Sequence, residues 1–81
     1  MFYYTYVLRS HFDKKLYVGW TSDLRSRLKN HSLGLVESTK LRIPFELIYY
    51  EACLSKEDAI KREKQLKTGF GRSYLKRRLT N

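Results

Sequence analysis

The amino-acid sequence predicts an α+β domain in which a three-stranded, antiparallel or mixed sheet is covered by helices. Segments with strand and helix patterns follow one another in the order β-β-α-β-α-α, and the connections between them are short. No internal repeat or linker divides the chain, and 81 residues are enough for one domain at most. We therefore expect residues 1–81 to fold as a single domain.

The first two strands are predicted to form a hairpin. Residues 2–9 are aromatic and β-branched, and residues 15–20 repeat this character after a polar connection. If the numbers of paired residues add to an odd sum, Tyr6 and Tyr17 lie on the same face of the hairpin. A sum of 23 would place the two tyrosines directly opposite each other, whereas an even sum would separate them.

The first helix is expected from Ser22 or Asp23 to His31. The run Thr-Ser-Asp at 21–23 offers a capping hydroxyl and an acid for the first turn. Gly34 follows the last helical residue and favours termination there.

The second half of the chain predicts one strand and two helices. Pro44 opens a strand over residues 45–52, and residues 55–58 have the form of a capping box. The helix that starts there should end near Lys67, and residues 72–79 have the character of a short third helix.

Composition favours a polyanionic partner, with nucleic acid as the first candidate. Seventeen Lys and Arg residues against eight Asp and Glu residues give a net charge of +9. The single cysteine, Cys53, excludes an intrachain disulfide scaffold and a zinc finger. Neither a membrane-spanning run nor a signal-peptide pattern is evident, so we expect a soluble cytoplasmic protein without membrane contact.

Three observations point to a chemical site. Glu63 falls on the apolar stripe of the second helix, where it either forms a salt bridge with Lys64 or Lys67 or binds a hard cation such as Mg²⁺. On the first helix, Arg27 and His31 are four residues apart beside two leucines, although an arginine there can also lie along the sheet edge.

The hairpin tyrosines complete this set, although most tyrosines in strands are structural. Phenols, an arginine, a histidine and an acid in a basic chain suit phosphodiester hydrolysis. The arginine can neutralise charge on the phosphate oxygens, a carboxylate-bound metal can act as a Lewis acid, and a phenol can orient or deprotonate a water.

At these residues the sequence resembles the GIY-YIG nuclease family, in particular its compact, stand-alone bacterial members. The family's two triplets correspond to residues 4–6 and 17–19, in which Tyr4 replaces the usual glycine. The segment at 21–31 resembles the family helix that carries the arginine and a frequent histidine, and residues 57–67 resemble the helix with the metal-binding glutamate.

The resemblance implies a three-stranded antiparallel sheet flanked by helices and metal-dependent cleavage of DNA. It assigns the catalytic set Tyr6, Tyr17, Arg27, His31 and Glu63, with Glu63 holding one Mg²⁺ or Mn²⁺ ion. Which tyrosine handles the proton stays open. A late asparagine of many larger members has no evident counterpart, since Asn81 is terminal.

Our leading hypothesis is a small endonuclease acting on DNA, including branched, damaged or single-stranded forms. Six basic residues are expected to contact the phosphate backbone of DNA: Lys40, Arg42, Arg72, Lys76, Arg77 and Arg78. One alternative is a nucleic-acid-binding module that keeps the fold with little or no catalysis. Another is a protein-interaction domain that delivers a larger repair complex to DNA. A protein partner that supplies specificity fits each hypothesis, and the oligomeric state stays open.

Overall fold

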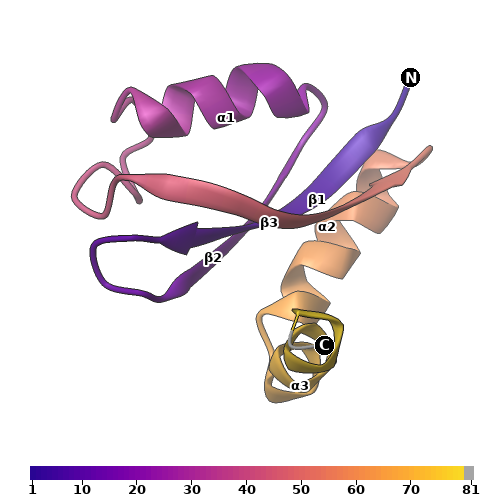
Figure 1. Ribbon diagram of the computed structural model, residues 1–81. Helices are drawn as coiled ribbons and strands as arrows, with labels where there is room; N and C mark the ends of the chain where they lie inside the picture. Colours follow the sequence, from indigo (N-terminus) through magenta and orange to yellow (C-terminus); the bar gives the residue numbers. More distant parts are fainter. Residues whose placement is uncertain (80–81) are drawn as a thin grey trace.

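The computed structural model describes residues 1–79 and confirms the predicted α+β class and the order of elements (Figure 1). Asn81, and with it the end of the predicted domain, lies outside the described residues. No described helix is long and apolar enough to cross a membrane. The elements are β1 (Tyr3–Ser10), β2 (Leu16–Thr21), α1 (Leu24–Ser32), β3 (Phe45–Cys53), α2 (Lys56–Leu66) and α3 (Gly69–Leu79).

The sheet is antiparallel with the strand order β2-β1-β3, so the first strand lies in the middle. In the hairpin, Tyr6 pairs with Gly19 and Leu8 pairs with Tyr17. The paired numbers add to an odd sum, so the two tyrosines share a face as one of the alternatives required. They are diagonal neighbours rather than directly opposite, because β2 is shifted by two residues from the register that would align them.

A four-residue turn closes the hairpin. The amide of Ser10 donates to the carbonyl oxygen of Lys15, and the carboxylate of Asp13 accepts from the amide of Lys15. Lys14 has a φ of +64°, in the left-handed region that favours glycine. Arg42 holds the turn from outside through an ion pair with Asp13.

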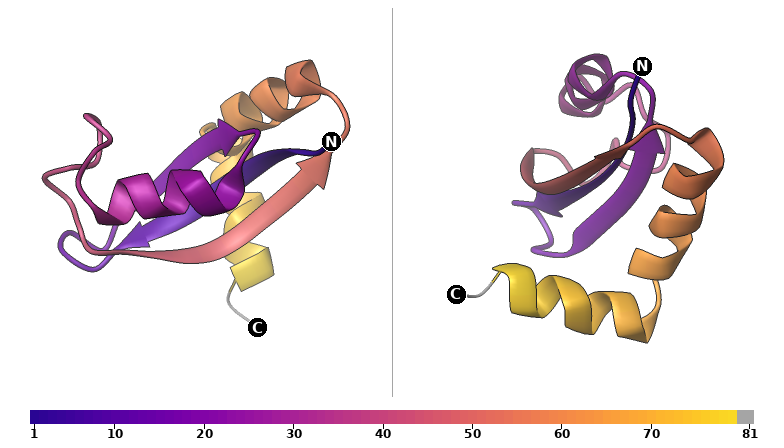
Figure 2. Two further views of the ribbon diagram at one scale, coloured as in Figure 1. Left: turned by 90° about the horizontal axis from the view of Figure 1, so that it is seen from above. Right: turned by 90° about the vertical axis from the view of Figure 1, so that its right-hand side faces the viewer.

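Helices cover both faces of the sheet. Helix α1 lies on one face and α3 on the other, with α2 alongside, as the right-hand view of Figure 2 shows. The apolar core lies on the α2–α3 face, where Val7 and Val18 of the hairpin pack with Leu66 and Leu75. Because β1 is the middle strand, its side chains are buried on both faces, which leaves the α1 face for a second, more polar centre.

The start of α2 follows the predicted cap, whereas the starts of α1 and α3 depart from the prediction. At α1 the cap is the carboxylate of Asp23 in place of the expected hydroxyl, and the first turn holds no acid. Asp23 caps α1 by accepting from the amide of Ser26, and Ser55 caps α2 by accepting from the amide of Asp58. Helix α3 starts three residues before the predicted position 72, since the glycines that suggested a break are part of the helix. A Cβ on Gly71 would come within 2.2 Å of a backbone oxygen in α2, so only glycine lets the two helices approach this closely.

Polar side chains also fasten α2 and α3 to the sheet. Arg62 of α2 donates from Nε and Nη2 to the carboxylate of Glu51 in β3, and Tyr49 donates to the same carboxylate. The hydroxyl of Tyr74 in α3 lies 3.1 Å from that of Tyr49, and the guanidinium of Arg62 covers the Tyr74 ring at 4.7 Å. We call these four residues the Glu51 network.

Candidate active site

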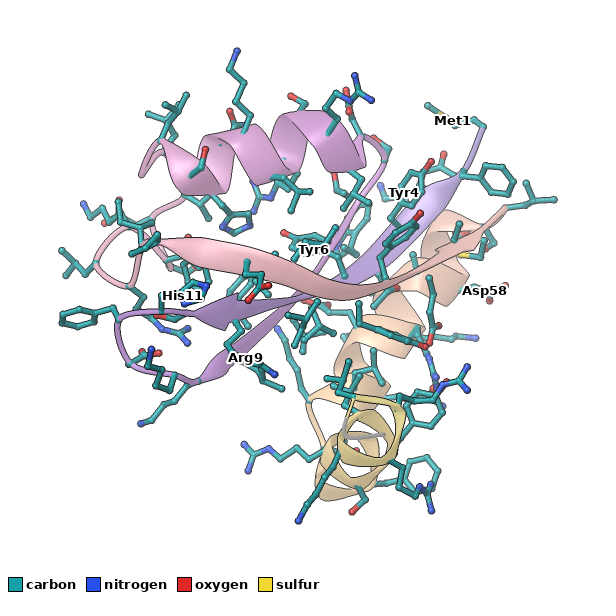
Figure 3. All side chains as sticks on the ribbon, viewed as in Figure 1. Met1, Tyr4, Tyr6, Arg9, His11 and Asp58 are labelled. Atoms are coloured by element: carbon teal, nitrogen blue, oxygen red, sulfur yellow. The ribbon has the colours of Figure 1, made fainter. Side chains whose placement is uncertain are left out.

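Tyr6 is the centre of the candidate site. Its side chain leaves the middle strand towards α1 (Figure 3) and is fully buried, with 0% of its surface exposed. The hydroxyl lies 2.8 Å from Nε2 of His31 and accepts a 3.3 Å hydrogen bond from Nε of Arg27. Residues 27 and 31 reach the same phenol because four residues make about one helical turn.

The burial of Tyr6 fixes the direction of these hydrogen bonds. Its oxygen accepts from Arg27, so its own proton needs an acceptor, and His31 Nε2 is the acceptor within reach. Nδ1 of His31 therefore carries the imidazole proton and donates to Thr39 Oγ1 at 2.8 Å. Thr39 in turn donates to the carbonyl oxygen of Val36. The imidazole is thus held neutral in one tautomer.

Burial shifts the pKa values of Tyr6 and His31 in the direction that these hydrogen bonds require. Burial, with a contribution from the nearby Arg27 charge, lowers the pKa of His31 to about 4. Burial raises the pKa of Tyr6 against the opposing effect of Arg27. The phenol and the imidazole are therefore both neutral near neutral pH.

Tyr17 is the more accessible of the two phenols. It is half-buried, its ring meets the His31 ring edge-on with centroids 5.2 Å apart, and its hydroxyl accepts from Ser38 on the exposed loop. Tyr17 also contributes to the raised pKa of the Arg27 guanidinium, after the larger effect of the Tyr6 hydrogen bond.

Gly19 of β2 pairs with Tyr6 of β1, at a position where a larger residue would meet the Tyr6 side chain. A Cβ at this position would lie 2.6 Å from the Tyr6 hydroxyl oxygen and 2.7 Å from the ring carbon that carries it. The Tyr6 side chain therefore occupies the space that any other residue at position 19 would fill.

Glu63 lies on α2, and within residues 1–79 its carboxylate forms a hydrogen bond with Lys67 and none with the phenols. Its carboxylate pairs with Lys67 at 3.0 Å, as one of the two sequence interpretations expected, and its side chain is 18% exposed. Burial is the main cause of the raised pKa of Tyr6, and the charge of Glu63 makes a small further contribution in the same direction.

The donor set around Glu63 fits a weakly held Mg²⁺ or Mn²⁺ ion. No group of three or more His, Cys, Asp or Glu side chains that could hold a metal occurs within residues 1–79. Magnesium, however, is commonly bound by one or two carboxylates together with waters and substrate phosphates. A single partly exposed carboxylate is compatible with that mode.

The basic residues predicted to bind DNA lie in different settings. Lys40 pairs with Glu37, Arg42 pairs with Asp13, and Arg78 lies over the Tyr74 ring. Arg72 and Arg77 are exposed on α3, as is Lys76, which makes a further interaction of its own. Only Arg72 borders a groove that reaches Tyr17.

Sequence reasoning missed the two hydroxyl residues that support the site. Ser38 and Thr39 come from the irregular loop between α1 and β3, which has no periodicity to place them. The adjacent Ser-Thr pair in a basic loop is the one signal that the sequence offered.

Sequence comparison assigns the class of this domain. Residues 2–78 match the GIY-YIG catalytic domain, and the chain belongs to the GIY-YIG family. A domain of this type indicates nuclease-type activity on DNA, and nucleases of this family generally use a divalent metal ion.

The more particular likeness is to small bacterial UPF0213 proteins. UPF0213 proteins of Streptococcus pyogenes serotypes M3 and M1 are 44% identical over 71 residues, which cover 86% of this chain and 76% of theirs. The solution structure of the UPF0213 protein BH0048 from Bacillus halodurans superimposes with a TM-score of 0.57 at 33% identity, covering 93% of this chain and 82% of that one. These similarities confirm the compact bacterial branch that the sequence motifs indicated.

Proposed function

We propose that this protein is a metal-dependent endonuclease that hydrolyses phosphodiester bonds of DNA. The observation that carries the proposal is the uncompensated Arg27. Its guanidinium lies beside two phenols and forms no ion pair within residues 1–79. A half-buried cation without a carboxylate partner is arranged to receive an anion from outside, and a phosphate oxygen fits its planar donors.

In this proposal the two tyrosines have different tasks. Tyr6 is fully buried and uses its proton for His31, so it acts as a positioning residue that orients Arg27. His31 is 1% exposed and holds Tyr6 in turn. Tyr17 is the phenol that a water can reach, so we assign it the task of orienting the attacking water. Arg27 would neutralise the charge that develops on the phosphate oxygens.

Glu63 would hold the divalent ion in this scheme. When bound, the ion would supply Lewis-acid chemistry at the phosphate and its leaving oxygen. The contribution of the chain is the carboxylate itself and the position that α2 gives it. DNA contacts would come from the basic surface, including the predicted residues of α3.

One observation favours an alternative function. The ammonium group of Lys67 donates to one carboxylate oxygen of Glu63 at 3.0 Å. It can thereby take the place of a divalent metal ion at that carboxylate. With that ion pair retained, the protein would be a nucleic-acid-binding module with the nuclease fold and little catalysis.

A nicking assay on supercoiled and branched DNA with Mg²⁺ or Mn²⁺ separates the two functions. Glu63→Gln removes the charge with little change of shape and should lower the rate by about 10²-fold or more, while DNA binding is retained. Glu57→Gln, an exposed acid on the first turn of the same helix, serves as the matched control and should leave the rate within about twofold.

Two outcomes would contradict the proposal. Equal nicking by wild type and Glu63→Gln would show that the site is misassigned. Binding without cleavage under either metal would favour the binding module.

A further inference from the structure

Thr39 is a buried hydroxyl residue in the irregular loop between α1 and β3, which lies at the same end of the sheet as the hairpin turn (Figure 1). The residue has 0% of its surface exposed, whereas its neighbours Ser38 and Lys40 are exposed. Its hydroxyl oxygen lies 2.8 Å from Nδ1 of His31. Buried polar groups in folded proteins have hydrogen-bond partners, and for the Thr39 side chain the close partner is this imidazole.

Hydrogen bonds on both sides of Thr39 hold the residue in place. Its amide donates to the carbonyl oxygen of Val36 at 3.1 Å, and the amide of Arg42 donates to its carbonyl oxygen at 2.9 Å. The loop is then attached to β1, where the fully buried hydroxyl of Ser10 donates to the carbonyl oxygen of Arg42 at 2.6 Å. The guanidinium of Arg42 pairs with Asp13 in the hairpin turn. The Thr39 hydroxyl is therefore positioned from the sheet, independently of α1.

His31 connects Thr39 with the centre of the candidate site. Its Nδ1–H donates to Thr39, its Nε2 accepts from the hydroxyl of Tyr6, and that hydroxyl accepts from Nε of Arg27. Each hydrogen bond in this line restricts the next, because the two nitrogens of an imidazole have fixed positions on one rigid ring. A change at Thr39 therefore reaches Arg27 through two intermediate side chains.

Ring packing alone does not decide where the nitrogens of His31 point. The rings of Tyr6, Tyr17 and Phe45 surround the imidazole, with centroids 5.7, 5.2 and 6.1 Å away. A ring turned over about its Cβ–Cγ bond would fill nearly the same space. It would, however, present carbon atoms to Thr39 and Tyr6 in place of Nδ1 and Nε2. The hydrogen bonds at the two nitrogens therefore select the orientation, and the bond to Thr39 is the one anchored in the loop.

We propose that Thr39 is a positioning residue for DNA cleavage: by accepting the Nδ1 proton, it fixes the His31 ring that holds the Tyr6 hydroxyl against Arg27. Thr39 is buried away from any substrate and acts only through His31. The proposal rests on the proposed function, since it takes Arg27 as the residue that receives the phosphate. It adds the loop between α1 and β3 to the parts of the chain that the reaction needs.

The test removes the Thr39 hydroxyl and compares the result with the loss of another buried threonine hydroxyl. Thr39→Val replaces the hydroxyl by a methyl group of similar size, and Thr39→Ser keeps the hydroxyl. The matched control is Thr5→Val, because Thr5 is 2% exposed and its hydroxyl donates to the carbonyl oxygen of Ala59 in α2 at 3.0 Å. Thermal unfolding measures the stability of each variant, and nicking rates are expressed per folded molecule.

We expect Thr39→Val to lower the nicking rate by about 10- to 100-fold, because Arg27 is no longer held in the position that the reaction requires. Thr39→Ser should restore the rate to within about threefold of wild type. Thr5→Val also loses a buried hydrogen bond, yet it should keep the rate within about twofold. Affinity for duplex DNA, measured by fluorescence anisotropy in EDTA, should change by less than about threefold in all three variants, since Arg27 is one of many phosphate contacts.

Proton NMR tests the contact without any cleavage. The Nδ1–H of His31 should give a slowly exchanging imidazole signal in wild type and in Thr39→Ser, since it is buried and hydrogen-bonded. His31→Gln should lack this signal, which assigns it. In Thr39→Val the signal should be lost, or its exchange should be faster by about tenfold or more.

A Thr39→Val variant that nicks DNA as fast as wild type would overturn the positioning role and leave the endonuclease function intact. A slow variant that retains the protected imidazole signal would also overturn it, because Thr39 would then not act through His31. An equal loss of rate in Thr5→Val would do the same, since any buried hydroxyl would then matter equally. A wild-type protein that cuts no DNA with either metal would contradict the endonuclease function, and the imidazole signal would still decide whether Thr39 fixes His31.

Discussion

On each face of the sheet, a tyrosine of a strand and an arginine of a helix belong to one hydrogen-bond network, and the two networks differ in how the charge of the arginine is balanced. On the α2–α3 face, Arg62 donates to Glu51, and the charges cancel within the network. On the α1 face, Arg27 donates to neutral Tyr6 and forms no ion pair with a carboxylate of residues 1–79. The Glu51 network is therefore electrically balanced without a ligand, whereas the Tyr6 network retains a positive charge that an anionic ligand can neutralise.

The largest expected difference between the two networks, in cleavage rate and in stability, comes from replacing each arginine by glutamine. Arg27→Gln should lower the DNA cleavage rate by about 10²–10³-fold, because the developing charge loses its donor, and should change stability by less than about 1 kcal/mol. Arg62→Gln should leave Glu51 without its cation and cost about 1–2 kcal/mol of stability, with the rate per folded molecule nearly unchanged. Nicking rates and urea unfolding of both variants measure this. A comparable loss of rate in both would remove the distinction between the networks.

The two networks should lose their contributions to the free energy of unfolding over different ranges of pH. His31 has a pKa of 6.5 when exposed and of about 4 in the folded protein. Since the unfolded chain binds this proton more readily, stability is full above about pH 6.5 and falls towards pH 4, by about 3 kcal/mol in total. Glu51, whose pKa is lowered from 4.5, loses its contribution only below that value. Urea unfolding between pH 7 and pH 4 should show this slope, and His31→Gln should flatten it. An unchanged slope in that variant would contradict the buried neutral imidazole.

Replacing Gly71 or Gly19 by alanine adds a methyl group on one face of the sheet at a time, so the two faces can be compared. At Gly71 the new Cβ would meet the backbone of α2, so the cost should be about 2–3 kcal/mol with no loss of rate per folded molecule. At Gly19 it would displace the Tyr6 ring from His31, with a smaller cost of about 1–2 kcal/mol but a large loss of cleavage. Gly69, which has no atom within 4 Å of an added Cβ, provides the neutral control. Thermal unfolding and nicking rates check the pair, and full activity in Gly19→Ala would show that Tyr6 needs no fixed position.

Much of this fold could be predicted from local signals. The capping box at Ser55 placed the start of α2, because its side-chain oxygen accepts from a free amide of the first turn. At α1 the polar run at 21–23 located the start to within two residues, although Asp23 is the cap in place of the expected hydroxyl. The start of α3 could not be predicted from local rules. Gly71 is there because two helices touch, which is a tertiary reason that a glycine in sequence does not disclose.

The candidate site was predictable where periodicity governs it. The helical spacing of Arg27 and His31 predicted that both lie on one side of α1, and both contact Tyr6. The odd register that puts Tyr6 and Tyr17 on one face was one of two alternatives that the sequence left open. Thr39 escaped prediction because it reaches His31 from a loop without repeating geometry. Whether these residues carry out catalysis stays a prediction for the variants above.

The crossing of Tyr6 and Gly19 also has a consequence for the variation that this domain can accept. A larger residue at position 19 is compatible with the sheet only if position 6 becomes smaller in the same molecule. Saturation libraries that change one of these positions at a time should therefore return few active clones, and tolerated changes should appear as linked pairs.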